Sequence, residues 1–338
     1  MIIPPLEFEP RLLHTLWGGK RLYGLKGIPA KNLTIGESWE VSPMAEIPSI
    51  VRGGELSGIS LPQVMQRFGQ EIMGEALCEK YGKKFPLLIK FIDAAEDLSV
   101  QVHPGKLEEG EEAKRLSNTK NAKNEIWYIM DATPEAEIIY GLSQDTTPHE
   151  LINYAIEGNL FELLRKIPVE AGEVYDNPAG TIHAIRKGNL ILEIQQPIDV
   201  TYRLWDYDRI DAESGNKRPL HLTEAVDTAI LKRCTKRNVP YRAIPNSATL
   251  ILEKEFATIE MVWVSQQKFD YEPPFSESFA VLVGLSGESI VSTNQGVEMN
   301  IRRGKTVLFP ASGMPLKISS NSEGHMLAIS LPSPIPLI

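Results

Sequence analysis

Three polar side chains that can bind a metal or an anion alternate along residues 97–104, at Ser99, Gln101 and His103, and the residues between them are valines. Because a strand has a period of two residues, one face of this segment would meet the core while the other carries a hydroxyl, an amide and an imidazole. Alone, the pattern is equally typical of a strand with one solvent-exposed face.

Later segments add further groups that can do chemistry. Glu125 stands at the start of an apolar strand pattern, and His183 follows a tight turn that contains proline and glycine. Glu193 and Arg203 lie on two more predicted strands whose opposite faces are apolar enough to be core. Charged side chains inside a barrel are costly unless they are paired or take part in function. We therefore expect these charges to line a functional site.

Gln101, His103, Glu125 and His183 together offer one neutral oxygen, two imidazoles and one carboxylate. This set suits Zn²⁺, Fe²⁺, Mn²⁺ or Ni²⁺ with a position left open for substrate or water, and it is too rich in nitrogen for Mg²⁺ or Ca²⁺. The long gap between the two histidines is not diagnostic, because only neighbouring strands of a barrel would bring them together. The alternative is that each histidine is a core residue with satisfied hydrogen bonds.

The elements that must position these residues are mostly short strands separated by glycine and proline turns. Two helical inserts interrupt them, at about residues 60–82 and 147–166. Each begins with a capping box, led by Ser60 in the first insert and by Thr147 in the second. The methionine and phenylalanine residues of the first insert recur at helical spacing, which indicates core packing.

A repeat divides the chain into two parts. Residues 172–179 and 304–311 both start with a glycine that is followed six and seven positions later by proline and alanine, so the two segments match at one constant offset. We infer two similar β-barrel units. Residues 1–240 are predicted to form the domain that bears the site and both helical inserts, and residues 241–338 a metal-free C-terminal β domain.

Length and composition bound the class of protein. The chain has 338 residues, enough for two domains, and its 42% hydrophobic and 23% charged residues are typical of a soluble globular protein. The net charge of −9 and the pI near 5.4 argue against a nucleic acid or an anionic membrane as partner. Lysine or arginine placed locally would still allow a phosphorylated metabolite to bind.

The cysteines and the distribution of apolar residues indicate the cellular compartment. Cys78 and Cys234 lie far apart without metal-type spacing, which favours two free thiols in a reducing compartment. No basic and then apolar leader opens the chain, and no apolar run approaches the length of a membrane span. We expect a cytoplasmic protein. The acidic residues 106–116 are predicted to form a solvated helix without chemistry.

Several segments, in this order, resemble the type I mannose-6-phosphate isomerases (phosphomannose isomerases) in their short bacterial form, which are zinc enzymes of the cupin superfamily. The motifs that carry the resemblance are the first metal strand at residues 99–104, the lysine-and-glutamate motif Lys123-Asn124-Glu125, the histidine turn at residues 178–184, and the catalytic strand pair of Glu193 and Arg203. The resemblance extends over residues 17–209 and more weakly through the C-terminal unit.

The resemblance implies a mainly β fold of two cupin-type (jelly-roll) β-barrel units with short helical inserts. It implies one Zn²⁺ per chain, bound by Gln101, His103, Glu125 and His183. It also implies that Arg203 is the active-site arginine. A small-molecule sugar phosphate is the expected partner, with no nucleic acid and no membrane, and the chain is expected to be a monomer or a weak homodimer.

The implied reaction interconverts D-mannose 6-phosphate and D-fructose 6-phosphate by moving a proton between C1 and C2 through an enediol(ate). A Lewis-acid metal and a fixed guanidinium suit the negative charge that grows on the two oxygens. A base must reach the carbon-bound proton, and Glu193 and Lys123 both remain open for this role. Lys90 and Ser99 are the candidates for binding the phosphate, and Trp17 is the candidate for a wall of the pocket.

Two alternative functions remain at this point. A cupin dioxygenase also uses two histidines and a glutamate, but Gln101 and Arg203 disfavour it. A non-catalytic sugar-binding or regulatory cupin would keep the fold without the chemistry. The full ligand set together with Arg203 argues against this, and no DNA-binding helix-turn-helix is evident. The chain lacks the large helical domain of the long eukaryotic form, which leaves its strictness for mannose 6-phosphate open.

Overall fold

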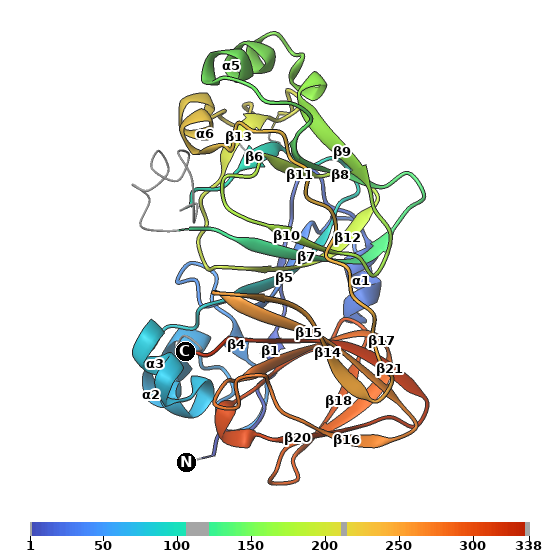
Figure 1. Ribbon diagram of the computed structural model, residues 1–338. Helices are drawn as coiled ribbons and strands as arrows, with labels where there is room; N and C mark the ends of the chain where they lie inside the picture. Colours follow the sequence, from blue (N-terminus) through green and yellow to red (C-terminus); the bar gives the residue numbers. More distant parts are fainter. Residues whose placement is uncertain (1, 106–121, 211–214, 335–338) are drawn as a thin grey trace.

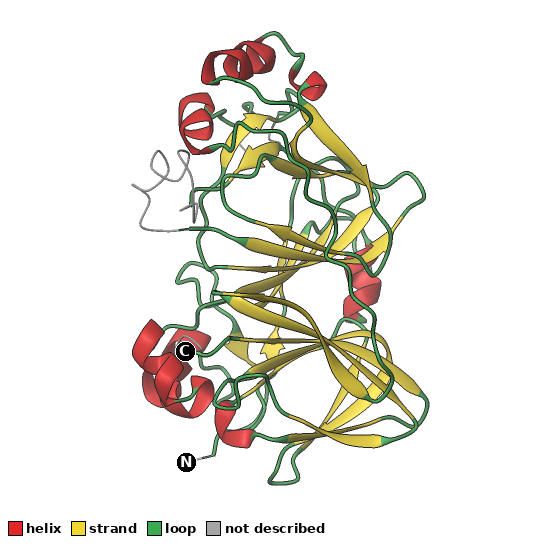
Figure 2. Cartoon of the chain, viewed as in Figure 1, coloured by secondary structure: helices red, strands yellow, loops and turns green. Residues whose placement is uncertain are grey.

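The computed structural model describes residues 2–105, 122–210 and 215–334, and the helix predicted for residues 106–116 lies outside these ranges. Over the described residues the fold is mainly β, as predicted, and two β units are stacked on each other (Figure 1). The helices lie outside the sheets (Figure 2). None of the described helices is both long and apolar enough to span a membrane.

Two antiparallel sheets form the N-terminal unit, with the strand orders β10-β7-β12-β5-β3-β2 and β13-β6-β11-β8-β9. The first sheet contains β2 (Arg11–Leu13), β3 (Glu37–Val41), β5 (Leu88–Asp93), β7 (Glu125–Ala132), β10 (Val174–Asn177) and β12 (Asn189–Gln195). The second contains β6 (Val100–Val102), β8 (Glu137–Leu142), β9 (Leu164–Pro168), β11 (His183–Ile185) and β13 (Tyr202–Trp205). A separate pair joins β1 (Phe8–Glu9) to β4 (Ile50–Val51).

Strand β12 illustrates how the period of two residues positions the site. Its leucine and isoleucine residues at positions 190, 192 and 194 pack into the core between the two units, whereas Ile191 and Glu193 point into the N-terminal unit. In β6, Val100 and Val102 pack into an outer apolar cluster, which leaves Gln101 facing the interior. The predicted alternation is therefore confirmed on both strands.

The C-terminal unit is an eight-stranded sheet of order β14-β15-β21-β17-β20-β16, in which β18 and β19 also pair with β17. Its strands are β14 (Ser247–Lys254), β15 (Ala257–Ser265), β16 (Lys268–Tyr271), β17 (Ala280–Ser292), β18 (Glu298–Arg302), β19 (Thr306–Phe309), β20 (Leu316–Ser319) and β21 (Glu323–Ser330). The pairing β10-β7-β12-β5 recurs as β19-β17-β21-β15, and β19 follows β10 at the same offset as the repeat in the sequence. The sequence repeat is therefore also a structural repeat.

An extensive apolar cluster joins the two units. It combines the outer face of β5, β7 and β12 with that of β15, β17 and β21, and Leu192 and Ile329 are among its members. Phe85 and Phe279 pack with their ring centroids 4.7 Å apart, and the backbone of Leu6 pairs with β19. The two units thus share a core, and a domain division at residue 240 stays a prediction.

Short helices accompany the sheets. They are α1 (Arg21–Lys26), α2 (Leu61–Met73), α3 (Glu75–Tyr81), α5 (Pro148–Ile156), α6 (Leu222–Thr228) and the 3₁₀ turns η1 (Leu160–Glu162) and η2 (Ala311–Gly313). Helices α2 and α3 lie where the first insert was expected, and both predicted capping boxes are present. Helix α5 and η1 lie in the second insert, whose last residues instead begin β9, because Leu164 pairs with Leu142 of β8.

Two features of the fold differ from the sequence prediction. Helices α1 and α6 were not predicted, since each has at most seven residues and neither has a side-chain cap. The alternation was expected to place Thr201, Arg203 and Trp205 on one face of their strand. The register of β13 on β6 shifts between Arg203 and Trp205, so Trp205 packs into the outer apolar cluster while Thr201 and Arg203 face the interior.

Candidate metal centre and active site

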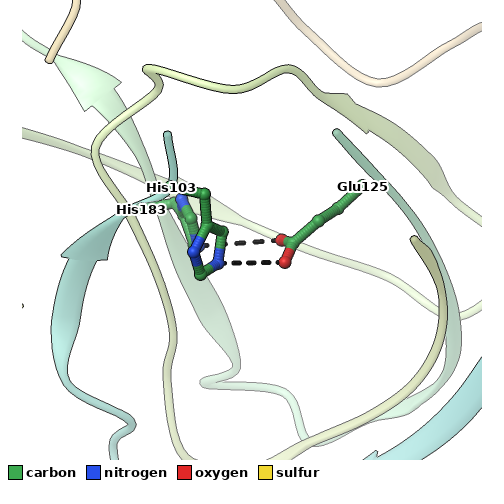
Figure 3. Close-up of side chains that lie close together, drawn as sticks. All are labelled: His103, Glu125 and His183. Atoms are coloured by element: carbon green, nitrogen blue, oxygen red, sulfur yellow. Dashed lines mark ion pairs between the residues drawn. The ribbon is translucent and has the colours of Figure 1, made fainter. Parts of the chain in front are cut away.

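A buried cluster of His103, Glu125 and His183 lies in the N-terminal unit (Figure 3). One ligand atom from each residue lies within 4.8 Å of the others. The Nε2 atom of His103 is 3.0 Å from Glu125 Oε1, and that of His183 is 3.7 Å from Glu125 Oε2. The amide nitrogen of Gln101 lies 3.5 Å and 3.4 Å from the same two imidazole nitrogens. The four predicted metal ligands are therefore brought together.

Neighbouring strands and one tight turn produce this arrangement. His183 begins β11 and is the direct partner of Gln101 on β6, while Glu125 begins β7 of the opposite sheet. In the turn before β11, Gly180 adopts a φ of +82° and donates its N–H to the carbonyl of His103 at 3.0 Å. A glycine is favoured there because other residues rarely adopt a positive φ.

Hydrogen bonds on the outer side of each imidazole fix its orientation. Nδ1 of His103 lies 2.8 Å from the carbonyl of Val200, and Nδ1 of His183 lies 2.8 Å from that of Thr181. Each Nδ1 thus donates to a carbonyl and leaves the lone pair of Nε2 aimed at the cluster. Burial, followed by the charge of Lys123, lowers the pKa of His103 to about 4, and burial also lowers the pKa of His183. Both imidazoles are therefore neutral near pH 7.

Glu125 is the anionic member of the cluster. Burial by itself would raise the pKa of Glu125, but His103, Lys123 and His183 outweigh it and hold that pKa well below its usual value. Asn177 donates to its Oε2 at 2.9 Å, and Lys123 Nζ lies 3.3 Å from Oε1. The carboxylate is thus ionised and oriented by neighbouring side chains.

These donors fit a divalent transition metal. Two neutral imidazoles whose Nε2 lone pairs face the cluster and one ionised carboxylate point at a common volume, which is the donor set of zinc or ferrous sites. Gln101 can add an oxygen, because a half-turn of its amide exchanges Oε1 and Nε2. Its Oε1 accepts a hydrogen bond from Ser99 at 3.0 Å in this structure, and after the half-turn its amide could donate to the same hydroxyl.

A second buried cluster of charged side chains lies on strands β3, β5 and β12 of the first sheet. Lys90 Nζ is 2.8 Å from Glu193 Oε2 and 3.4 Å from Glu37 Oε1, and Trp127 donates to Glu193 Oε1 at 2.9 Å. Burial and the charge of Glu125 raise the pKa of Glu193, although Lys90 opposes this. Burial would lower the pKa of Lys90, but its carboxylate partners raise it instead. Lys90 is therefore charged.

Glu125 and the pair of Lys90 and Glu193 line one pocket between the sheets. Every other predicted site residue also lines it except His103, which adjoins the pocket through its contact with Glu125. Trp17 and Ser99 are buried in its wall, and Arg203 on β13 stands directly opposite Gln101 on β6. The lining residues are Trp17, Glu37, Trp39, Lys90, Ile92, Leu98, Ser99, Gln101, Lys123, Glu125, Trp127, His183, Ile185, Glu193, Asp199, Thr201, Arg203 and Arg218.

Sequence reasoning missed three charged residues of this pocket, Glu37, Asp199 and Arg218. Glu37 lies two residues before Trp39, in a segment of glycine, tryptophan and small polar residues that is equally typical of an ordinary turn. Asp199 and Arg218 occur in segments without strand periodicity, where an isolated charge is typical of a solvated loop. No local signal in the sequence could have assigned them to the site.

The C-terminal unit has a different interior. Its core is built from apolar side chains of β15, β17, β19, β20 and β21, among them Ala280, Leu282 and Leu316. In the N-terminal unit Glu125 of β7 pairs with Asn177 of β10, and at the equivalent position of the C-terminal unit Ala280 of β17 pairs with Phe309 of β19. An alanine therefore takes the place of the carboxylate ligand. Across the described residues, His103, Glu125 and His183 form the one group of three such side chains that could hold a metal.

Comparisons with known proteins place this site in context. The sequence model of a family described as phosphomannose isomerase type I, catalytic domain, matches residues 8–140. A probable mannose-6-phosphate isomerase, GmuF, of Bacillus subtilis (strain 168) is 35% identical over 91% of this chain and 93% of its own length. The mannose-6-phosphate isomerase ManA of the same organism is 34% identical over 96% of this chain and 98% of its own length.

Solved structures agree with these sequence relatives. The crystal structure of the mannose 6-phosphate isomerase from Bacillus subtilis superposes with a TM-score of 0.80 at 28% identity, covering 97% of this chain and 99% of that one. A mannose 6-phosphate isomerase bound with zinc and yttrium superposes with a TM-score of 0.74 at 16% identity, again over 97% and 99% of the two chains. The second likeness bears on the fold alone.

Proposed function

The chain belongs to the type I phosphomannose isomerase family, and on that premise we propose that it is a zinc-dependent aldose–ketose isomerase that interconverts D-mannose 6-phosphate and D-fructose 6-phosphate. The observation that carries the proposal is the buried cluster of His103, Glu125 and His183 beside Gln101, at the base of a pocket lined by further charged groups. Relatives aligned over almost the whole chain bear the name of this activity.

We assign one Zn²⁺ per chain to this cluster. Gln101, His103, Glu125 and His183 would hold it, and the neutral imidazoles with outward Nδ1 hydrogen bonds support the assignment. When bound, zinc supplies a Lewis acid that stabilises negative charge on the substrate oxygens during enolisation.

Glu193 is our candidate for the group that moves the proton between C1 and C2. It lines the pocket, and a raised pKa makes its carboxylate a stronger base than an ordinary glutamate. Lys90 keeps that carboxylate ionised through their contact at 2.8 Å. Lys123 is the second candidate, but its ammonium group lies 3.3 Å from Glu125 and from His103, which suits it better to donating a hydrogen bond to a substrate oxygen.

Arg203 and the remaining pocket residues complete the proposal. The guanidinium of Arg203 is fixed on β13 opposite Gln101, where it would stabilise the enediolate oxygens. Ser99, Trp17 and Lys90 line the pocket and are proposed as substrate contacts. For Lys90 this role adds to the neutralisation of Glu193 and Glu37.

A coupled assay for fructose 6-phosphate formed from mannose 6-phosphate tests the reaction and the metal together. We expect turnover that vanishes after chelation and returns on addition of zinc. Turnover that persists in protein shown to be metal-free would contradict the metal assignment. No turnover in folded, zinc-replete protein would contradict the assigned reaction and leave only the fold and the cluster standing.

A further inference from the structure

Two arginines from different segments meet at the pocket. Arg203 lies on β13, and Arg218 lies beyond a turn in which Tyr207 and Asp208 both adopt positive φ values. The chain then returns beside β13, because His221 donates its backbone N–H to the carbonyl of Arg203 at 2.8 Å. Both arginines line the pocket as a result.

The deeper cations of the pocket are already neutralised by buried carboxylates. Lys90 is paired with Glu193 and Glu37, and Lys123 is in contact with Glu125. A doubly charged phosphate that replaced any of these carboxylates would leave a buried anion without its partner, which is strongly destabilising. The positive charge that is open to a ligand must therefore come from another part of the pocket.

Arg218 carries a positive charge that is open to a ligand, and hydrogen bonds fix the orientation of its side chain. Its Nε and Nη2 atoms both donate to the buried carboxylate of Asp206, at 2.7 Å and 2.5 Å. The same carboxylate also accepts from Arg209, so two guanidinium groups share one negative charge and a positive charge is left over. Over the described residues, Arg218 Nη1 makes no hydrogen bond and stays available to a ligand.

Arg203 supplies the second unused donor. Its Nε is buried and makes no hydrogen bond within the described part of the chain. Arg203 and Arg218 line the same pocket, and burial, followed by the charge of Arg218, lowers the pKa of Arg203, because the two positive charges repel each other. Asp199 also faces them and offsets part of this repulsion, but it is exposed to solvent and is screened accordingly.

We propose that Arg218, oriented by Asp206 and acting beside Arg203, binds the phosphate group of the substrate and determines the preference for phosphorylated sugars. The proposal rests on the function proposed above. Arg218 is then a specificity-determining residue and Asp206 a positioning residue. The remaining Nη1 group of Arg218 can donate to an oxygen of the phosphate, and the negative charge of the phosphate offsets the repulsion between Arg218 and Arg203.

The chain provides a matched control. Arg209 donates to the same Asp206 carboxylate, but it does not line the pocket. Arg209→Gln and Arg218→Gln therefore each remove one cation from Asp206, and only Arg218→Gln removes a donor from the pocket. Arg218→Lys keeps the charge but loses the planar fork.

Steady-state kinetics of the zinc-loaded full chain with mannose 6-phosphate test the proposal. Because phosphate binding contributes equally to the ground state and the transition state, Arg218→Gln should raise KM by about tenfold to a hundredfold and change kcat by less than about threefold. Arg218→Lys should recover part of the loss, and Arg209→Gln should keep KM within about twofold of the wild type. An unchanged KM in Arg218→Gln, or the same rise in Arg209→Gln, would overturn the proposal.

Binding of inorganic phosphate, measured by calorimetry on the same proteins, separates this proposal from the proposed function. Wild type and Arg209→Gln should bind phosphate at least about tenfold more tightly than Arg218→Gln, whether or not the chain isomerises mannose 6-phosphate. Equal phosphate affinity in all three proteins, with zinc content and circular dichroism unchanged, would refute the role of Arg218. An absence of turnover with this difference intact would instead refute the assigned reaction.

Discussion

Replacing Lys90 by methionine should destabilise the N-terminal unit strongly. Lys90 is 7% exposed and Glu193 is 3% exposed, and their charged atoms are 2.8 Å apart. Glu37 shares the same ammonium group at 3.4 Å. Methionine keeps most of the length and volume of the lysine side chain but removes its charge, so Lys90→Met leaves Glu193 and Glu37 without a cationic partner in the interior.

The expected cost follows from this geometry. At 2.8 Å and an effective dielectric constant of about 20, one unit charge attracts its opposite by about 6 kcal/mol. Removing one partner of a buried pair typically costs about 3–5 kcal/mol, since protonation and relaxation of the remaining carboxylate recover part of the loss. We therefore expect Lys90→Met to lower the free energy of unfolding by about 3–5 kcal/mol.

Urea unfolding followed by tryptophan fluorescence measures this change, because Trp17, Trp39 and Trp127 all line the pocket beside Lys90 and report on the N-terminal unit. Metal-free protein should be used so that differences in zinc binding do not enter the measured stability. The control is the double variant Lys90→Met with Glu193→Gln, which removes both charges of the closer pair. It should recover most of the lost stability.

A loss of less than about 1 kcal/mol in Lys90→Met would refute the reasoning, since that is the range of an exposed pair. So would a double variant that is no more stable than Lys90→Met alone. Either result would mean that Lys90 is not a structural counter-ion for Glu193, and that its role lies in contacts with the substrate.

Three further predictions concern the site. His103→Ala should lower the bound zinc well below one ion per chain and abolish turnover while circular dichroism stays unchanged, and full activity in its metal-free form would show that the cluster is not the metal site. Arg203→Ala should retain zinc but lose about a hundredfold or more in kcat, as for loss of an oxyanion stabiliser, so an unchanged kcat would mark Arg203 as structural. Burial raises the pKa of Glu193, and a base must be ionised to accept a proton, so kcat/KM should fall as the pH drops below this raised value. The acid limb of the pH profile should thus lie above about pH 4.3, the ordinary value of glutamate, and a limb at or below that value would argue against Glu193 as the base.

Much of the architecture was predictable because it depends on neighbours in the sequence. The alternation at Val100, Gln101 and Val102 is a property of any strand with one buried face, and the capping boxes at Ser60 and Thr147 need only residues three positions apart. The repeat of the glycine, proline and alanine pattern at a constant offset identified two related units without any contact information. For the proposed metal ligands, the sequence supplied the donor types and their order along the chain, and the resemblance to a family grouped them into one site.

The charge balance of the pocket was decided only by the tertiary structure. The pairing of Lys90 with Glu193 and Glu37 joins three strands of one sheet, and no sequence pattern specifies which carboxylate neutralises which lysine. The position of Arg218 depends on a loop that turns back beside β13 and on the carboxylate of Asp206. Periodicity acts between residues that are close in sequence, whereas Coulomb attraction and burial act between residues that are close in space. The sequence by itself therefore determined the strands, the turns and the ligand types, and only the folded chain decided which charges are paired and which stay open to a substrate.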